Sequence, residues 1–325
     1  MLVYMIRRVS QSLLVVAVMA SLVFLAVFAV GDPIDILANP NADQAERAAI
    51  AQSLGLDRPL YEQFGLFVVN ALQGDLGRSF VYNLPAIDVI LERLPATLEL
   101  ALVGLLFSIG IGIPLGLTAG LKPESWVGRT IMSGSILGFS LPNFWIGLML
   151  ILLFAVELRI LPAGGRGPTT SLFGVELALF TLEGWKHLIL PAFTLALYKA
   201  ALVIRIAQAG TRDVMLQDYI RFARAKGLSR SRIISVHVLK NILIPVITVL
   251  GLELGSMIAF AVVTETVFAY PGMGKLLIDS INRLDRPIIV AYLMLTVLIF
   301  VIINLVVDLL YAAVDPRVRL SEARG

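Results

Sequence analysis

The sequence predicts an all-α integral membrane protein with six transmembrane helices, a large first extracytoplasmic loop and a helical loop on the cytoplasmic side. Hydrophobic residues make up 58% of the 325 residues and charged residues only 15%, and the mean hydropathy is +0.89. These values lie outside the usual range of soluble domains. A helix needs about 20 apolar residues to cross the hydrocarbon core, and six windows of about that length carry at most one interior charge.

The six expected spans alternate with loops on opposite sides of the membrane. We expect transmembrane helices at 9–30, 99–121, 130–156, 187–209, 241–264 and 288–313, with a single membrane domain at roughly 95–313. The remaining segments are the N-terminus 1–8, the loops 31–98, 157–186, 210–240 and 265–287, and the tail 314–325. The stretch from Leu172 to Leu182 is too short to span and contains Glu176, so we expect it at the membrane interface.

The first span is similar to a secretory signal, but its apolar run is longer and no Ala-x-Ala site follows it. We therefore expect an uncleaved first helix. The loop 31–98 that follows is long and rich in acidic residues, with short amphipathic stretches around Ala42 to Ser53 and Tyr61 to Leu72. Loops of this size usually carry a function or a docking surface.

The distribution of Lys and Arg predicts the orientation. Six spans place both termini on one side, and the segments there (1–8, 121–129, 205–240 and 313–325) hold 15 Lys or Arg in 66 residues, against 10 in the 122 residues opposite. The richer side is expected to be cytoplasmic, termini included. A basic cytoplasmic face usually serves topology and contact with the lipid bilayer, so we expect no nucleic-acid partner.

A ridge of small residues runs along the second span. At every fourth position the chain has a small side chain: Gly104, Ser108, Gly112, Gly116 and Gly120. Such ridges let helix backbones approach closely where lipid provides no hydrophobic drive for association. The ridge predicts a tight helix crossing, which is a packing role and not a chemical one.

Ionisable residues inside spans are costly and tend to face a cavity or a partner. Lys199 and Glu253 lie near the middle of their spans, whereas Glu99, Glu265 and Asp308 lie near span ends, where we expect water to reach them. Two interpretations of Lys199 and Glu253 stay open. They line a translocation pathway, with Glu265 as a third candidate, or they form a buried structural pair.

The basic loop before the fifth span predicts a helix, a glycine break and a second helix. Asp218 can cap the first helix, Phe222 and Ala223 can lie on one side of it, and Gly227 suits the left-handed residue that ends it. Ser229 can cap the second helix. The result is a compact projection with a small apolar spot and a basic rim, shaped to enter a partner's groove.

The same loop reads Ala223-Arg224-Ala225-Lys226-Gly227-Leu228, followed by His237, Leu239, Asn241 and Pro245. This pattern resembles the cytoplasmic coupling loop of ATP-binding-cassette importer permeases in the peptide and nickel branch. It departs from the wider superfamily pattern at Arg221, Phe222 and Lys240. Other stretches agree in order along nearly the whole chain: Gly31-Asp32-Pro33, Leu54-Gly55-Leu56-Asp57-Arg58-Pro59, Gly74-Asp75-Leu76-Gly77, Arg93-Leu94-Pro95-Ala96-Thr97-Leu98-Glu99-Leu100 and Pro271-Gly272-Met273-Gly274.

The resemblance implies a permease subunit of an ATP-driven importer in a bacterial cytoplasmic (inner) membrane, moving di- or oligopeptides by alternating access. The partners that it implies are a second homologous permease, two ATP-binding subunits that carry ATP and Mg, and an extracytoplasmic solute-binding protein. This chain itself would be non-catalytic and hold no cofactor. Contact with the ATPase would involve Arg221, Phe222, Ala223, Arg224, Ala225, Lys226, Gly227 and Leu228. An irregular external loop over the pore mouth would include Pro271, Gly272, Gly274 and Asp285.

Alternatives remain at two levels. The cargo could instead be a nickel chelate, glutathione or a glycoside. From other classes, an ion-coupled secondary carrier or a membrane scaffold could share this composition. Secondary carriers often contain inverted repeats, and we find no internal match between the two halves of the chain. A scaffold would leave the coupling loop unexplained.

Enzyme signatures are missing from the sequence. Gly272-Met273-Gly274-Lys275-Leu276 lacks the first glycine and the final Ser or Thr of a phosphate-binding loop. His187 and His237 stand outside any His-Glu-x-x-His pattern, and we expect them to make surface or interfacial hydrogen bonds. The chain has no cysteine, which excludes a thiolate metal site and a disulfide framework.

Overall fold

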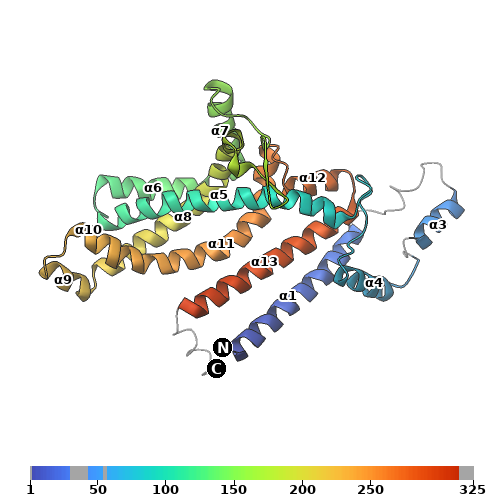
Figure 1. Cartoon of the computed structure of the whole chain (residues 1–325), viewed down its shortest axis with the longest axis horizontal. Helices are drawn as coiled ribbons and strands as arrows, with labels where there is room; N and C mark the ends of the chain where they lie inside the picture. The colour runs from blue at the N-terminus through green and yellow to red at the C-terminus, as the bar shows by residue number, and fades with distance from the viewer. Residues whose placement is uncertain (1, 30–42, 54–56, 315–325) are drawn as a thin grey trace. The chain divides into compact units, whose positions relative to one another are not determined.

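The computed structural model describes residues 2–29, 43–53 and 57–314 and divides them between two compact units (Figure 1). The terminal unit comprises Met1–Thr97 and Pro271–Gly325, and the central unit comprises Leu98–Tyr270. Motif residues 31–33 and 54–56, and the expected tail beyond residue 314, lie outside the described residues.

Two long apolar helices of the terminal unit, α1 (Leu2–Ala29) and α13 (Arg286–Val314), lie side by side (Figure 1). The Arg8 guanidinium, near the N-terminal end of α1, pairs with the Asp308 carboxylate, near the C-terminal end of α13. The unit also contains α3 (Gln44–Ser53), α4 (Leu60–Leu72), the first turns of α5 (Ala86–Leu121) and α12 (Met273–Asn282). The two amphipathic stretches expected in the first loop therefore correspond to the helices α3 and α4.

The prediction of an irregular loop at 265–287 is wrong for the middle of this segment, where the chain forms the helix α12. Met273, Leu276 and Ser280 are buried at helical spacing, so one face of α12 packs inward. The turn residues that suggested a loop lie only at its two ends. Pro271 and Gly272 precede the helix, and its first backbone N–H, that of Met273, donates to the Thr97 hydroxyl at 2.8 Å.

The central unit is built around α8 (Leu182–Met215), which packs against α6 (Trp126–Ser140), α7 (Asn143–Leu150) and α11 (Leu239–Val267). Helix α7 continues as a π-helix, η1 (Ile151–Glu157). Before α8 the chain forms a two-stranded hairpin, β1 (Thr170–Leu172) and β2 (Val175–Leu177), and a 3-10 turn, η2 (Ala178–Phe180). The stretch that we expected at the interface is thus mostly a hairpin. Between α8 and α11 lie α9 (Asp218–Ala225), α10 (Arg230–Arg232) and η3 (Ile233–Val238).

The helical membrane fold predicted from composition is confirmed. Five helices in the described part of the chain are long and apolar enough to cross a membrane, and the pair α6 and α7–η1 supplies a sixth if it forms one span. That pair bends by 104° where we expected a single helix over 130–156. Pro142 explains the bend, because proline has no N–H to continue α6 and holds Leu141 in an extended conformation (φ −85°, ψ 137°).

The ridge of small residues on α5 lies directly against α8. A Cβ atom added at Gly112 would be 2.5 Å from Val203 Cβ, and one added at Gly116 would be 2.7 Å from the Ile204 carbonyl oxygen. The Ser108 hydroxyl lies 3.1 Å from the Ala196 carbonyl oxygen across the same contact. Backbone or side-chain atoms of α8 occupy the space that a larger side chain at these α5 positions would need, so only small residues fit.

We predict that Gly116→Ala destabilises the protein by about 1–3 kcal/mol, because its methyl group would force α5 and α8 apart. Gly110→Ala is the matched control, since a Cβ atom there has nothing within 4 Å. Thermal unfolding of the purified protein in detergent should show a lower midpoint for Gly116→Ala alone. Equal midpoints for both variants would contradict the close α5–α8 contact.

Candidate functional site

The coupling loop between α8 and α11 folds onto the central unit through one face of α9. Ile220 is fully buried and Ala223 nearly so, in a cluster that also includes Val203 of α8 and Ile242 of α11. The Asn241 side chain, at the start of α11, donates to the Tyr219 hydroxyl at 3.2 Å. Helix α9 is therefore joined to both α8 and α11 through this shared cluster.

The opposite face of α9 is exposed and combines an aromatic ring with basic side chains. Phe222 is 62% exposed, and the Lys226 ammonium lies 4.6 Å from the centre of its ring. Arg221 and Arg224 are exposed beside it. This surface has the aromatic centre and cationic rim that are typical of binding hot spots.

The turn after α9 has the expected local structure. Gly227 adopts a left-handed conformation with φ +79°, and the Ser229 hydroxyl accepts the Arg232 N–H. Asp218, however, is the first helical residue instead of the cap. Gln217 occupies the cap position without a side-chain hydrogen bond, and Asp218 pairs with Arg221 at 3.2 Å.

The eight residues expected at the ATPase contact do not share one face. Phe222 and Ala223, expected on one side of the helix, point in different directions, because neighbouring residues of a helix are rotated by about 100°. Ala223 is buried and Leu228 is half-buried against the cluster beneath α9. The other members of the set are exposed: Arg221, Phe222, Arg224, Ala225, Lys226 and Gly227.

The structure brings Lys199 of α8 and Glu253 of α11 together as an ion pair. Ser256 completes the cluster: it donates to the Glu253 carboxylate at 2.7 Å and lies 2.9 Å from the Lys199 ammonium. The side chains of Lys199 and Glu253 are 12% and 27% exposed. On the α8 side, Tyr198 stacks on Phe139 with ring centres 4.5 Å apart. An ion pair inside the span region is thus charge-balanced, hydrogen-bonded and partly accessible.

A second ion pair lies at the start of the central unit. Glu99, which we expected to meet water, has a fully buried side chain, and its carboxylate accepts from Arg166 at 2.8 Å and from the Leu179 N–H at 2.6 Å. Arg166 also donates to the Glu176 carbonyl oxygen. One buried carboxylate therefore holds both ends of the hairpin segment against α5.

The end of α11 is equally closed to water. Glu265, a pathway candidate, is fully buried, and so is Tyr270 just beyond the helix. Burial raises the pKa of the Tyr270 phenol, and the nearby Glu99 carboxylate raises it further, so the phenol stays neutral. The His187 ring hydrogen-bonds to the Gly164 carbonyl oxygen at 2.8 Å, so it serves as a hydrogen-bonding group, as expected.

The external residues singled out from the sequence serve mainly as packing and turn positions. Gly272 and Gly274 are buried at the start of α12, and Pro271 is half-buried. Asp285 is fully buried, and its carboxylate accepts from the Ser79 hydroxyl and from the backbone N–H of Phe80 at 3.1 Å. Asp285 thereby fixes the turn before α5 to the start of α13.

Sequence reasoning missed the hairpin tip. Phe173 is 98% exposed there, and both Phe173 (φ 51°) and Gly174 (φ 81°) have positive φ angles. Two such residues joining antiparallel strands make the tight turn that matches strand twist. The sequence Leu172-Phe173-Gly174-Val175 could have indicated this turn, because a glycine interrupts a short apolar run there.

Comparison with known proteins agrees with this architecture. Residues 112–320 match the family described as binding-protein-dependent transport system inner membrane component, and residues 1–101 match the N-terminal part of such membrane components. The chain belongs to this family. It is a multi-pass permease subunit of an ATP-binding-cassette importer in the peptide and nickel branch, and it is non-catalytic, because ATP hydrolysis in these systems belongs to a separate subunit.

Two similar proteins come from Escherichia coli. The chain is 37% identical over 305 residues to the dipeptide transport system permease protein DppB of strain K12, covering 89% of this chain and 90% of the relative. It is 39% identical over 320 residues to the glutathione transport system permease protein GsiC of strain CFT073, covering 98% and 99%. A solved structure of the MetNI methionine ABC transporter shares the fold, with a TM-score of 0.54 at 16% identity over 71% of this chain and 98% of that one.

We predict that Glu99→Gln or Arg166→Met lowers the free energy of unfolding by about 3–5 kcal/mol, because either change leaves one buried charge without its partner. Lys186→Met is the control, since its ion pair with Glu183 is 43% and 57% exposed and such pairs contribute about 1 kcal/mol or less. Thermal unfolding of the three variants in detergent measures the difference. Shifts of equal size would refute the anchoring role of the buried pair.

Proposed function

We propose that this permease imports di- or oligopeptides together with a second homologous permease, two ATP-binding subunits and an extracytoplasmic solute-binding protein. The observation that carries the coupling part of this proposal is the exposed face of α9, with Phe222 at its centre. The ATP and Mg sites belong to the partner subunits. The dipeptide and glutathione relatives support a peptide cargo, and they leave glutathione itself as the second candidate.

The attachment of α9 supports a rigid transfer of motion. Its buried residues Ile220 and Ala223 belong to a hydrophobic cluster that also contains Val203 of α8 and Ile242 and Val246 of α11. A displacement of α9 by a nucleotide-driven partner would therefore move the ends of both long helices together. This is the kind of rigid-body switch that alternating access requires. The basic loop would face the cytoplasm, as would both termini.

The Lys199–Glu253 pair supports a zwitterionic cargo. We place Lys199 and Glu253 on the translocation pathway, where a peptide's terminal carboxylate and ammonium can exchange with the two members of the pair. A charge-balanced site favours cargo with no net charge, because an unbalanced charge in a low-dielectric pathway is costly. Glu265 remains a weaker pathway candidate, since its complete burial favours a structural role.

Replacement of Phe222 by Asp should separate transport from folding. Phe222 is exposed, so the chain should fold normally, while loss of an aromatic hot spot should weaken ATPase binding by about 2 kcal/mol or more, which is about 30-fold. Val236→Asp is the control, since Val236 is 49% exposed on η3, outside α9. Copurification of the ATPase and peptide uptake in proteoliposomes are measured. Normal uptake by Phe222→Asp would remove α9 from the contact.

A double-mutant cycle tests the ion pair. Glu253→Gln and Lys199→Met should each destabilise the protein, and the double variant should recover roughly 1–3 kcal/mol of that loss as interaction energy. A pathway role further requires that the recovered double variant loses its preference for zwitterionic over charged dipeptides in uptake assays. Wild-type stability and wild-type preference in the double variant would make the pair purely structural.

A further inference from the structure

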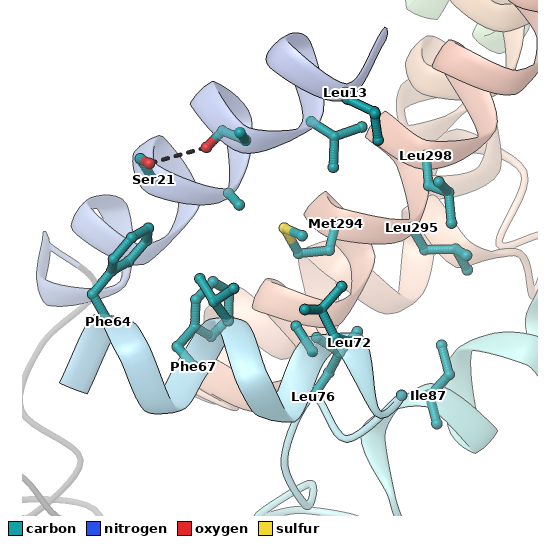
Figure 2. A pocket seen from close by; sticks show the side chains of 16 residues that line it. Leu13, Ser21, Phe64, Phe67, Leu72, Leu76, Ile87, Met294, Leu295 and Leu298 are labelled. Carbon is teal, nitrogen blue, oxygen red and sulfur yellow. Dashed lines mark hydrogen bonds between the residues drawn. The ribbon is translucent and has the colours of Figure 1, made fainter. Parts of the chain in front are cut away.

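The terminal unit contains an apolar groove of about 640 Å³. It lies between α1, α4 and α13, and Figure 2 shows side chains from all three helices converging on it. Its wall includes Leu13 of α1, Phe64 and Phe67 of α4, and Met294 and Leu298 of α13. The volume falls within the range of about 300–1,000 Å³ that is usual for ligand sites.

The groove offers almost no polar partner. Among the described residues that line it, Ser21 carries the one hydroxyl, which donates to the Ala17 carbonyl oxygen at 2.9 Å, a bond drawn in Figure 2. A peptide segment placed here would bury backbone N–H and C=O groups without hydrogen bonds, which is energetically unfavourable. An all-hydrocarbon chain carries no such cost.

Helix α4 indicates which solvent surrounds the groove. Phe64 and Phe67 face inward and pack on Phe24 of α1, with ring centres 5.3 and 5.8 Å away. Its exposed residues are mixed: Leu66, Val69 and Leu72 are apolar and 43%, 50% and 84% exposed, whereas Glu62 and Asn70 are polar and also exposed. A helix that exposes apolar residues beside a few polar ones fits the membrane interface, where acyl chains meet headgroups. Acyl chains and headgroups are therefore both within reach of the groove.

The groove continues into a more polar hollow of about 450 Å³. The two spaces share the lining residues Gly74, Leu76 and Ile87. The hollow adds one acidic and one basic side chain, Asp75 and Arg78, both of which are exposed. One oxygen of Asp75 accepts the Gly77 N–H at 2.9 Å, and the Arg78 guanidinium donates to the Asn83 carbonyl oxygen. An apolar groove joined to a hollow with one acidic and one basic side chain has the polarity of an amphiphile.

We propose that this composite site binds one membrane phospholipid, with an acyl chain in the apolar groove and a zwitterionic headgroup in the adjoining hollow. The phosphate lies toward Arg78 and the ammonium group of an ethanolamine headgroup toward Asp75. In the orientation proposed above, the lipid comes from the extracytoplasmic leaflet. It fills the space between α4 and the two spanning helices and so fixes α4 in place.

Val68→Trp tests the acyl-chain part of the site. Val68 lines the groove, whereas Val69 is exposed on the other side of α4, so Val69→Trp is a control that adds the same ring one residue away. The full transporter is reconstituted in nanodiscs of phosphatidylethanolamine with a trace of chain-labelled photoreactive phosphatidylethanolamine. Labelling of α1, α4 and α13 is mapped by mass spectrometry. We expect Val68→Trp to lose most of the labelling and Val69→Trp to keep it.

Asp75→Asn tests the headgroup part. The amide oxygen can still accept the Gly77 N–H, so the turn is kept while the charge is removed. We expect its preference for phosphatidylethanolamine over phosphatidylglycerol to fall by about two- to fivefold, the effect of one exposed ion pair. Glu62→Gln, an exposed acid of α4 outside the hollow, should leave the preference unchanged.

Three results would overturn the proposal. They are equal labelling of Val68→Trp and wild type, an absence of labelling at the groove in wild type, and displacement of the label by an excess of peptide cargo, which would assign the groove to cargo. Because labelling is measured without ATP or transport, failure here is distinct from failure of the proposed import function.

Discussion

The close approach of α5 to α8 is the contact on which the central unit depends. Lipid provides no hydrophobic drive for helices to associate, so the contact must come from backbone atoms that can touch. Gly112 and Gly116 permit this, and Ser108 adds a hydroxyl close to the Ala196 carbonyl oxygen. Because α8 also packs on α6, α7 and α11, its position relative to α5 sets the positions of the other helices of this unit.

Helix α8 links the hairpin and the coupling loop of the central unit. Its first turn follows the hairpin that Glu99 and Arg166 hold, its middle carries Lys199, and its last turn leads into α9. A long helix transmits displacement with little loss, because its backbone hydrogen bonds lie along its axis. The proposed coupling mechanism therefore needs no separate lever. It needs only that α9 stays attached to α8 and α11, which the burial of Ile220 and Ala223 provides.

Exposed apolar surface has two different meanings in this protein. On α4 it includes Leu66, Val69 and Leu72 beside the polar Glu62 and Asn70, as expected at a membrane interface. On α9 it is confined to Phe222 within a basic rim, as expected for a protein contact in water. The neighbours distinguish the two: the Lys226 ammonium lies over the ring of Phe222, whereas Leu66, Val69 and Leu72 follow one another at three-residue spacing on α4.

Local signals in the sequence determined the membrane class, the helical fold, the register of the small-residue ridge, and the break at Gly227 with the cap at Ser229. Each depends on residues within one or two helical turns, where spacing alone defines the geometry. Only the tertiary structure decided the partners of the buried charges. Arg166 lies 67 positions from Glu99, and Ser79 lies 206 positions from Asp285. It also decided that α12 is a helix and that Ala223 faces inward, because those outcomes depend on which surfaces are buried when distant segments pack together.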